Sequence, residues 1–149
     1  MSGPAVSTDA GQDARAQAEA MYAADRASQA LGIQLLDVAP GRARTGMRVT
    51  AQMVNGHGIC HGGYLFLLAD SAFAFACNTH GAAVVASGAD VDFLAPVREG
   101  DELIAEAVER VLRGRSGLYD VTVSRDGEPV VEFRGRSRSL RPDSGRPSR

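Results

Sequence analysis

The feature that most constrains the fold is a long apolar segment in the middle of the chain, residues 62–81, GGYLFLLADSAFAFACNTHG. The segment contains no proline and is apolar on nearly every side when placed on a helix, which is typical of a helix buried in a core. Gly81 follows the last apolar turn, and glycine is favoured just past a helix end. The sequence therefore predicts a buried central helix over residues 62–81.

The sequence on both sides of this helix predicts strands. Between Arg42 and Val49, small or apolar residues alternate with arginines, which indicates a half-buried strand. The clearest hairpin is residues 119–140, where alternating runs flank Asp126-Gly127, a pair suited to a two-residue turn. Strands are expected over residues 33–41, 42–50, 85–93 and both arms of 119–140. This order predicts an α+β domain with an antiparallel sheet packed against the central helix.

Residues 101–113, DELIAEAVERVLR, allow two interpretations. Apolar pairs recur at helical spacing, so periodicity alone predicts a helix. The position between two strands, followed by the turn-like residues 114–117 (GRSG), favours a strand instead. Both alternatives stay open at this point.

The two ends of the chain differ from its centre in composition. Residues 1–13 are small and polar and are expected to be disordered. Good helix formers over residues 13–32, ending at Gly32, predict a first helix. The tail 142–149 is polar and contains proline, so it is also expected to be disordered. A single domain is predicted over residues 14–141.

Charge and cysteine content exclude several classes of protein. A formal net charge of −2 gives no reason to expect nucleic acid or an anionic membrane as a partner. The longest apolar run, Leu65–Cys77, is shorter than the roughly 20 residues that span a bilayer. Two cysteines and no leader-like start indicate a reducing compartment. We therefore expect a soluble, cytoplasmic protein.

The segment NGHGICHGGYLFLLAD, residues 55–70, places one carboxylate, Asp70, inside the apolar run. A buried, unpaired carboxylate costs several kcal/mol or shifts its pKa upward. One interpretation is a buried acid satisfied by a nearby amide or hydroxyl. The other is an acid held in a cleft, where it serves as a base or nucleophile.

Two other kinds of site are weighed for the same segment. His57, Cys60, His61 and Asp70 could ligate a metal, but their spacing matches no common zinc pattern. Cys60 could be a nucleophile if His61 or His57 activated it. Cys77 is expected in the core, and His80 is expected to cap or flank the helix end. The preferred interpretation needs no metal or cofactor.

The start of the central helix supplies a second reactive component. Gly62 and Gly63 fall where the first backbone N–H groups of a helix lack an internal partner, and such donors stabilise an oxyanion. Gly62 and Asp70 are eight residues apart, roughly 12 Å along one helix. One carbonyl group cannot touch both. A symmetric dimer is therefore predicted, in which each helix start faces the other chain's acid.

The segment NGHGICHGGYLFLLADSAFAFACNTHG resembles the hotdog-fold acyl-CoA thioesterases, and within them the phenylacetic-acid-degradation (PaaI) subgroup. The resemblance continues through SGADVDFLAPVREGDELIAEA, SGLYDVTV and FRGRSRSL, and so covers about Tyr22 to Leu140. It implies the hotdog fold, a sheet wrapped around the long helix, with residues 101–113 as a strand. It also implies dimers joined through a continuous sheet, and commonly dimers of dimers.

The resemblance also implies roles for the site residues. Asp70 attacks the thioester carbonyl or activates water, and the N–H of Gly62 polarises that carbonyl from the partner chain. Asn55 positions the nucleophile or water, and His61 supports the loop or bonds near the thioester. The implied reaction is hydrolysis of an aryl-acetyl-CoA, or a related medium acyl-CoA, to the free acid and CoA.

Substrate contacts beyond these four residues are weaker expectations. Gly63 is predicted to bind substrate at the helix start, and Arg98, Arg113 and Arg115 are candidates for the CoA phosphates. Two alternatives remain open. One is a hotdog dehydratase or hydratase that uses His61 with Asp70. The other is a non-catalytic acyl-CoA-binding dimer.

Overall fold

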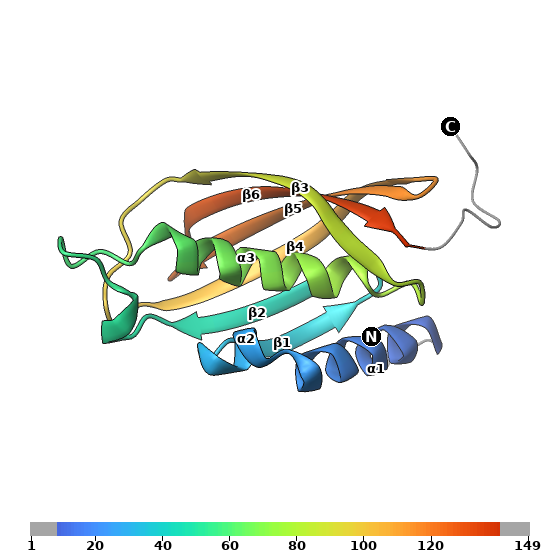
Figure 1. Ribbon diagram of the computed structural model, residues 1–149, viewed down its shortest axis with the longest axis horizontal. Helices are drawn as coiled ribbons and strands as arrows, with labels where there is room; N and C mark the ends of the chain where they lie inside the picture. The colour runs from blue at the N-terminus through green and yellow to red at the C-terminus, as the bar shows by residue number, and fades with distance from the viewer. Residues whose placement is uncertain (1–8, 141–149) are drawn as a thin grey trace, which may run out of the picture.

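The apolar segment forms helix α3, Gly62–Cys77, which lies against one face of the sheet (Figure 1). The structure is a computed structural model that describes residues 9–140. Leu68, Ala69 and Ala72 of α3 have no exposed surface, and Phe73 is buried with them. The predicted central helix is thus confirmed, and it forms the middle of the core.

Six antiparallel strands curve around α3 in the order β1-β2-β4-β5-β6-β3. Their bounds are Gln34–Ala39 (β1), Arg42–Arg48 (β2), Val84–Phe93 (β3), Glu102–Arg113 (β4), Ser116–Arg125 (β5) and Glu128–Ser139 (β6). A short 3₁₀ helix, Ala51–Met53, follows β2. Figure 1 shows the sheet wrapped around the helix, so the predicted α+β hotdog fold is confirmed.

The helical periodicity of residues 101–113 gives the wrong prediction, because these residues form β4. This strand pairs with β2 on one side and β5 on the other, for example through Thr45↔Ala105 and Ala107↔Val121. Leu103, Ala105 and Ala107 are buried at every second position. Two neighbouring strands satisfy the backbone of this segment, and that pairing overrides the local periodicity.

The single helix predicted over residues 13–32 is two helices, α1 (Asp9–Ala24) and α2 (Arg26–Ala30). The Asp25 side chain accepts from the N–H of Ser28 and caps α2, which separates it from α1. The predicted disorder is wrong for residues 9–13, because α1 begins at Asp9 and buries Ala14 and Ala18. Residues 1–8 and the predicted tail at 142–149 lie outside the described residues.

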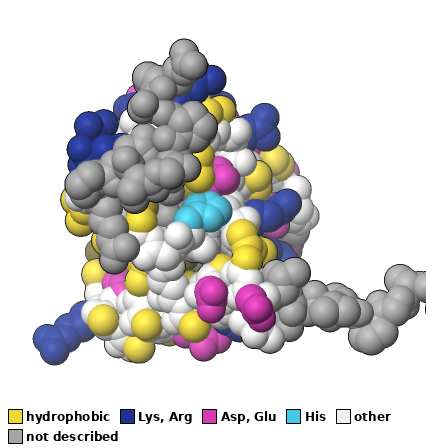
Figure 2. Space-filling view, turned by 90° about the vertical axis from the view of Figure 1, so that its right-hand side faces the viewer, with side chains coloured by type: hydrophobic (Ala, Val, Ile, Leu, Met, Phe, Trp, Pro, Cys, Tyr) yellow, Lys and Arg dark blue, Asp and Glu magenta, His cyan; other side chains and the backbone are white. Residues whose placement is uncertain are grey.

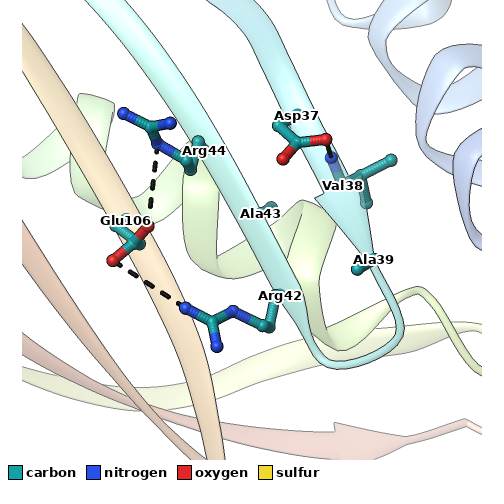
Figure 3. Close-up of a pocket in the computed structure, with 7 residues that line it drawn as sticks. All are labelled: Asp37, Val38, Ala39, Arg42, Ala43, Arg44 and Glu106. Atoms are coloured by element: carbon teal, nitrogen blue, oxygen red, sulfur yellow. Dashed lines mark hydrogen bonds and ion pairs between the residues drawn. The ribbon is translucent and has the colours of Figure 1, made fainter. Parts of the chain in front are cut away.

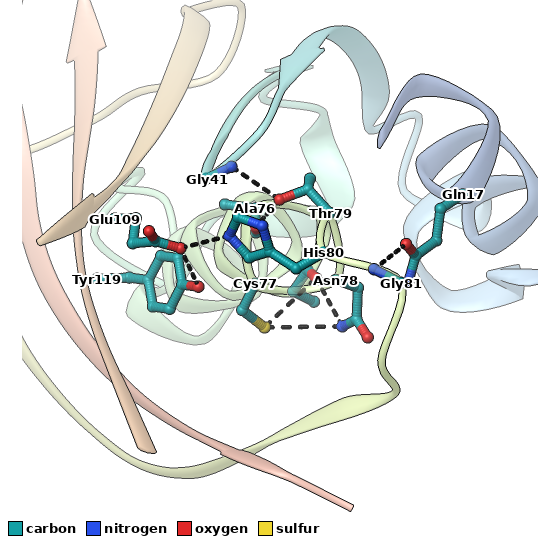
Figure 4. A network of polar contacts seen from close by, with 11 residues as sticks. Gln17, Gly41, Ala76, Cys77, Asn78, Thr79, His80, Gly81, Glu109 and Tyr119 are labelled. Atoms are coloured by element: carbon teal, nitrogen blue, oxygen red, sulfur yellow. Dashed lines mark hydrogen bonds and ion pairs between the residues drawn. The ribbon is translucent and has the colours of Figure 1, made fainter. Parts of the chain in front are cut away.

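Helix α3 ends at Cys77, four residues before Gly81, where the sequence predicted its end. The Thr79 hydroxyl donates to the carbonyl of Ala76 at 2.8 Å and accepts from the N–H of Gly41 at 2.7 Å (Figure 4). Side chains after the last turn therefore satisfy groups at the helix end and tie it to the β1–β2 turn.

His80 follows the helix end, as predicted, and contacts strand β4. Its Nε2 lies 2.8 Å from Glu109 Oε1, and the buried Tyr119 hydroxyl donates to the same oxygen at 2.8 Å (Figure 4). Cys77 is buried, as predicted, and burial raises the pKa of its thiol to about 12. None of the helices within residues 9–140 is both long and apolar enough to cross a membrane.

Candidate active site

The start of α3 presents one free backbone donor. His61 caps the helix, and its Nδ1 accepts from the N–H of Gly63 at 3.2 Å. No group within residues 9–140 accepts from the N–H of Gly62. The helix start thus offers Gly62 to a ligand. The expectation for Gly63 is corrected, because His61 already occupies its N–H.

An apolar groove of about 430 Å³ opens at this helix start. Gly62, Ile59 and Leu65 line it together with Phe93 and Leu94 at the end of β3. A Cβ atom on residue 62 would lie 2.9 Å from Cζ of Phe93, so only glycine fits without a shift of that ring. The free N–H therefore lies beside apolar side chains, where a hydrogen bond to an oxyanion is strengthened by the low dielectric.

Asp70 lies on the side of α3 that the sheet leaves uncovered. It is half-buried, as are Phe66, Leu67 and Ala74 at helical spacing on the same side. No hydrogen bond or ion pair to Asp70 exists within residues 9–140. Burial, followed by the negative charge of Asp25, raises the pKa of the Asp70 carboxyl above its ordinary value. An unpartnered acid of this kind is a candidate base or nucleophile.

Within one chain, the structure does not bring the two key groups together. Gly62 and Asp70 belong to the same unbroken helix, so their Cα atoms are separated by roughly 12 Å along its axis. A thioester carbonyl held at Gly62 is out of reach of the acid of the same chain. The two groups can serve one reaction only if they come from two chains.

Asn55 organises the loop that precedes the helix. Its Oδ1 accepts from the N–H of His57 at 2.9 Å and from the N–H of Ile59 at 3.2 Å. The side chain is exposed, and no hydrogen bond from its Nδ2 exists within the described chain. The carbonyl end of Asn55 thus holds the loop, while its amide NH₂ stays available to a substrate or water.

The structure gives no support to the metal and cysteine alternatives. No three His, Cys, Asp or Glu side chains within residues 9–140 are grouped so that they could hold a metal ion. Cys60 is buried, and its thiol donates to the carbonyl of His61 at 3.6 Å. Burial raises the pKa of the Cys60 thiol to about 11, so the thiol stays protonated and is a poor nucleophile at neutral pH.

The three candidate arginines lie at opposite ends of the molecule. Arg98 is exposed and pairs with Ile59 beside the helix start. Arg113 and Arg115 lie at the β4–β5 turn, near the C-terminal end of α3, and the Arg115 guanidinium donates to the carbonyl of Ser139. Figure 2 shows this end of the molecule, where the visible arginine side chains are scattered and do not form one patch.

A second hollow, of about 240 Å³, lies over β1, β2 and β4. Arg42 and Arg44 both reach Glu106 there, at 3.9 and 3.6 Å, and Asp37 lies on the opposite wall (Figure 3). The two arginines thus face two carboxylates. This balance of charge does not favour an anion such as a CoA phosphate.

Sequence reasoning missed two residues close to the site. Phe93 packs against Gly62, but only as the last residue of a strand that is distant in sequence. Asp25 acts on Asp70 from the junction between α1 and α2. No local pattern connects either residue to the segment 55–70, because both contacts depend on the tertiary fold.

Comparisons with known proteins agree with this site. The model of the thioesterase superfamily matches residues 57–132. The acyl-coenzyme A thioesterase PaaI of Escherichia coli (strain K12) is 48% identical over 124 residues, which are 83% of this chain and 89% of that protein. The structure of the E. coli PaaI protein from the phenylacetic acid degradation operon matches with a TM-score of 0.88 and 43% identity, covering 91% of this chain and 99% of that one. The TT0310 protein of Thermus thermophilus matches with a TM-score of 0.76 and 41% identity, covering 78% and 98%.

Proposed function

The chain belongs to the thioesterase superfamily, and from this premise we propose that it hydrolyses an acyl-CoA to the free acid and CoA. The proposed acyl part is an aryl-acetyl group, phenylacetyl or hydroxyphenylacetyl, or a related medium acyl group. The observation that carries the proposal is the pairing of a free N–H on Gly62, beside an apolar groove, with an unpartnered acid on the same helix.

The proposed active unit is a homodimer with shared sites. Within residues 9–140, β3 is the last strand of the sheet and has no neighbour on its outer side. Val85, Phe93 and Leu94, on or just after this strand, are 45%, 52% and 54% exposed. A long edge strand with apolar side chains favours pairing with another strand, and a second copy of β3 fits that role. Such pairing would extend the sheet and cover the open side of α3.

Further association into a dimer of dimers is part of the same proposal. Leu36 is 44% exposed and lies over Gly46, where a Cβ would be 3.1 Å from its Cδ1. Ile104 borders the same position at 3.6 Å, on the face of the sheet away from α3. A small apolar area there supports contact between two sheets.

In the proposed reaction, the thioester carbonyl oxygen accepts the N–H of Gly62 from one chain. Asp70 of the other chain then either attacks the carbonyl carbon or takes a proton from a water that attacks it. In the first route, the thiolate of CoA leaves and water hydrolyses the acyl anhydride. In the second, Asp70 returns the proton to the leaving sulfur. In both routes, the negative charge that develops on the oxygen is stabilised at the helix start.

The remaining expectations concern the CoA end of the substrate and the location of the protein. Arg98 is placed to reach CoA phosphates bound near the helix start of its own chain, whereas Arg113 and Arg115 could reach a site only from the partner. The proposed location is the cytoplasm. The free, buried thiols of Cys60 and Cys77 agree with that proposal.

The direct test is release of free thiol from a panel of acyl-CoA esters. We expect hydrolysis of phenylacetyl-CoA and hydroxyphenylacetyl-CoA to exceed that of acetyl-CoA. Hydration of an enoyl-CoA without thiol release would instead indicate a dehydratase or hydratase. Tight binding of phenylacetyl-CoA with neither reaction would indicate a non-catalytic acyl-CoA-binding dimer.

Asn55 allows a test that separates loop support from catalysis. Asn55→Asp retains the oxygen that accepts from the N–H groups of His57 and Ile59 but loses the NH₂ donor. We expect kcat to fall by about tenfold or more, with little change in Tm. Asn55→Ala loses both functions and should lower Tm as well. Equal kcat in wild type and Asn55→Asp would rule out a catalytic role for the amide.

A further inference from the structure

The junction between α1 and α2 is fixed against α3. The Tyr22 hydroxyl donates to the carbonyl of Ile33 at 2.7 Å, and the Tyr22 ring packs on Phe75 of α3, with 6.2 Å between ring centroids. The N–H of Asp25 donates to the carbonyl of Tyr22 at 3.0 Å. Asp25 therefore has a defined position beside the central helix.

A chain of hydrogen bonds leads from Asp25 to the residue next to Asp70. The Ser28 hydroxyl donates to Asp25 Oδ2 at 2.6 Å, and its N–H donates to Oδ1 at 2.9 Å. The hydroxyls of Ser28 and Ser71 are 2.8 Å apart. Because Ser28 uses its only hydroxyl proton on Asp25, Ser71 must be the donor between the two serines. We call this chain the Asp25–Ser71 bridge.

The Asp25–Ser71 bridge is shielded from water at its centre. Ser28 is 1% exposed and Ser71 is 7% exposed, so water cannot readily replace their hydrogen bond. Removing one partner would leave a buried hydroxyl without its bond, which costs about 1–3 kcal/mol. The contact thus holds α2 against the turn of α3 that carries Asp70.

We propose that Asp25 is a positioning residue for the reaction, because the Asp25–Ser71 bridge holds its carboxylate beside the turn of α3 that carries Asp70. The inference rests on the proposed function, in which Asp70 is the base or nucleophile. Asp25 does not touch the substrate in this account. It acts through its negative charge and through the bridge.

No cation offsets these two acids within residues 9–140. Neither Asp25 nor Asp70 forms an ion pair with an arginine or histidine there. His61 lies at the other end of α3, and Cys77, farther along it, is a neutral thiol. The strands packed against α3 carry their charged side chains toward solvent or in pairs with each other, as in Arg42 and Arg44 with Glu106, Arg134 with Asp120, Arg136 with Asp90, Arg125 with Asp101, and Glu109 with His80.

The consequence for Asp70 follows from electrostatics. Two hydrogen bonds from Ser28 stabilise the charged form of Asp25. Its charge, together with burial, raises the pKa of the Asp70 carboxyl. A carboxylate with a higher pKa takes a proton more readily, which benefits a base that works near neutral pH.

The test compares wild type with Asp25→Asn, which removes the charge and retains a favoured cap for α2. Titration of the Asp70 carboxyl, followed by ¹³C NMR, should shift to lower pH in the variant. The acid limb of the profile of kcat/KM against pH should move in the same direction. The plateau should fall by less than about tenfold, because Asp70 itself is retained. An Asp70 titration unchanged in Asp25→Asn overturns the proposal.

Two further variants keep the test decisive. Asp13→Asn removes one exposed acid from α1 and should leave the Asp70 titration where it is. If Asp25→Asn does not fold, Asp25→Ser gives the same measurement, because it also keeps an oxygen to cap α2. The NMR titration does not depend on turnover, so absence of thiol release in wild type would contradict only the proposed function.

Discussion

Asp70→Asn is expected to reduce thiol release from phenylacetyl-CoA by about 10²–10⁴-fold while the protein stays folded and assembled. The amide has the same shape as the carboxylate but can neither take a proton from water nor attack a carbonyl carbon. Asp13→Asn, with the same loss of charge on an exposed turn of α1, should retain wild-type kcat. Full activity in Asp70→Asn would remove the acid from the mechanism.

The stability of Asp70→Asn follows from the raised pKa of this carboxyl. An acid whose pKa is higher in the folded than in the unfolded state stabilises the fold most at low pH, below its unfolded pKa. That contribution is lost as the pH rises through the folded pKa. At pH 7 the charged Asp70 therefore disfavours folding, and Asp70→Asn should have an equal or higher Tm. A sharply lower Tm would show that Asp70 is a satisfied structural residue.

The fold could be predicted from the sequence wherever periodicity and turn residues agree. The apolar run at residues 62–77 and the hairpin about Asp126-Gly127 are of this kind, and both are where expected. β4 is different, because its apolar pairs at helical spacing conflict with its real environment between β2 and β5. Strand pairing depends on partners far along the chain, so local spacing cannot reveal it.

The site shows the same division between local and tertiary information. The capping role of His61 and the free N–H of Gly62 depend only on position at a helix start, and the sequence indicates both. The occupied N–H of Gly63 depends on the rotamer of His61, which the sequence does not specify. Phe93 and Asp25 reach the site through the sheet and through the junction of two helices. These contacts needed the structure.

Gly62→Pro is expected to lower kcat by about 10²–10³-fold relative to Gly62→Ala, because only proline removes the backbone N–H. Proline is favoured at the first position of a helix, and the extended backbone of His61, at φ −62° and ψ 134°, suits a residue before proline. Both variants add a Cβ that meets the Phe93 ring, so Gly62→Ala controls for that displacement. Equal kcat in the two variants would exclude the Gly62 N–H as the oxyanion donor.

The pair of inactive variants also tests whether one site is built from two chains. In a heterodimer of Asp70→Asn with Gly62→Pro, one site has both defects, while the other combines an intact Gly62 and an intact Asp70. Co-expression with two affinity tags and purification over both should therefore restore about half of the wild-type activity per dimer. If each chain held a complete site, every site in the mixture would carry one defect. Activity would then stay at the level of the inactive variants, and the roughly 12 Å between Gly62 and Asp70 on one helix would have to be bridged in another way.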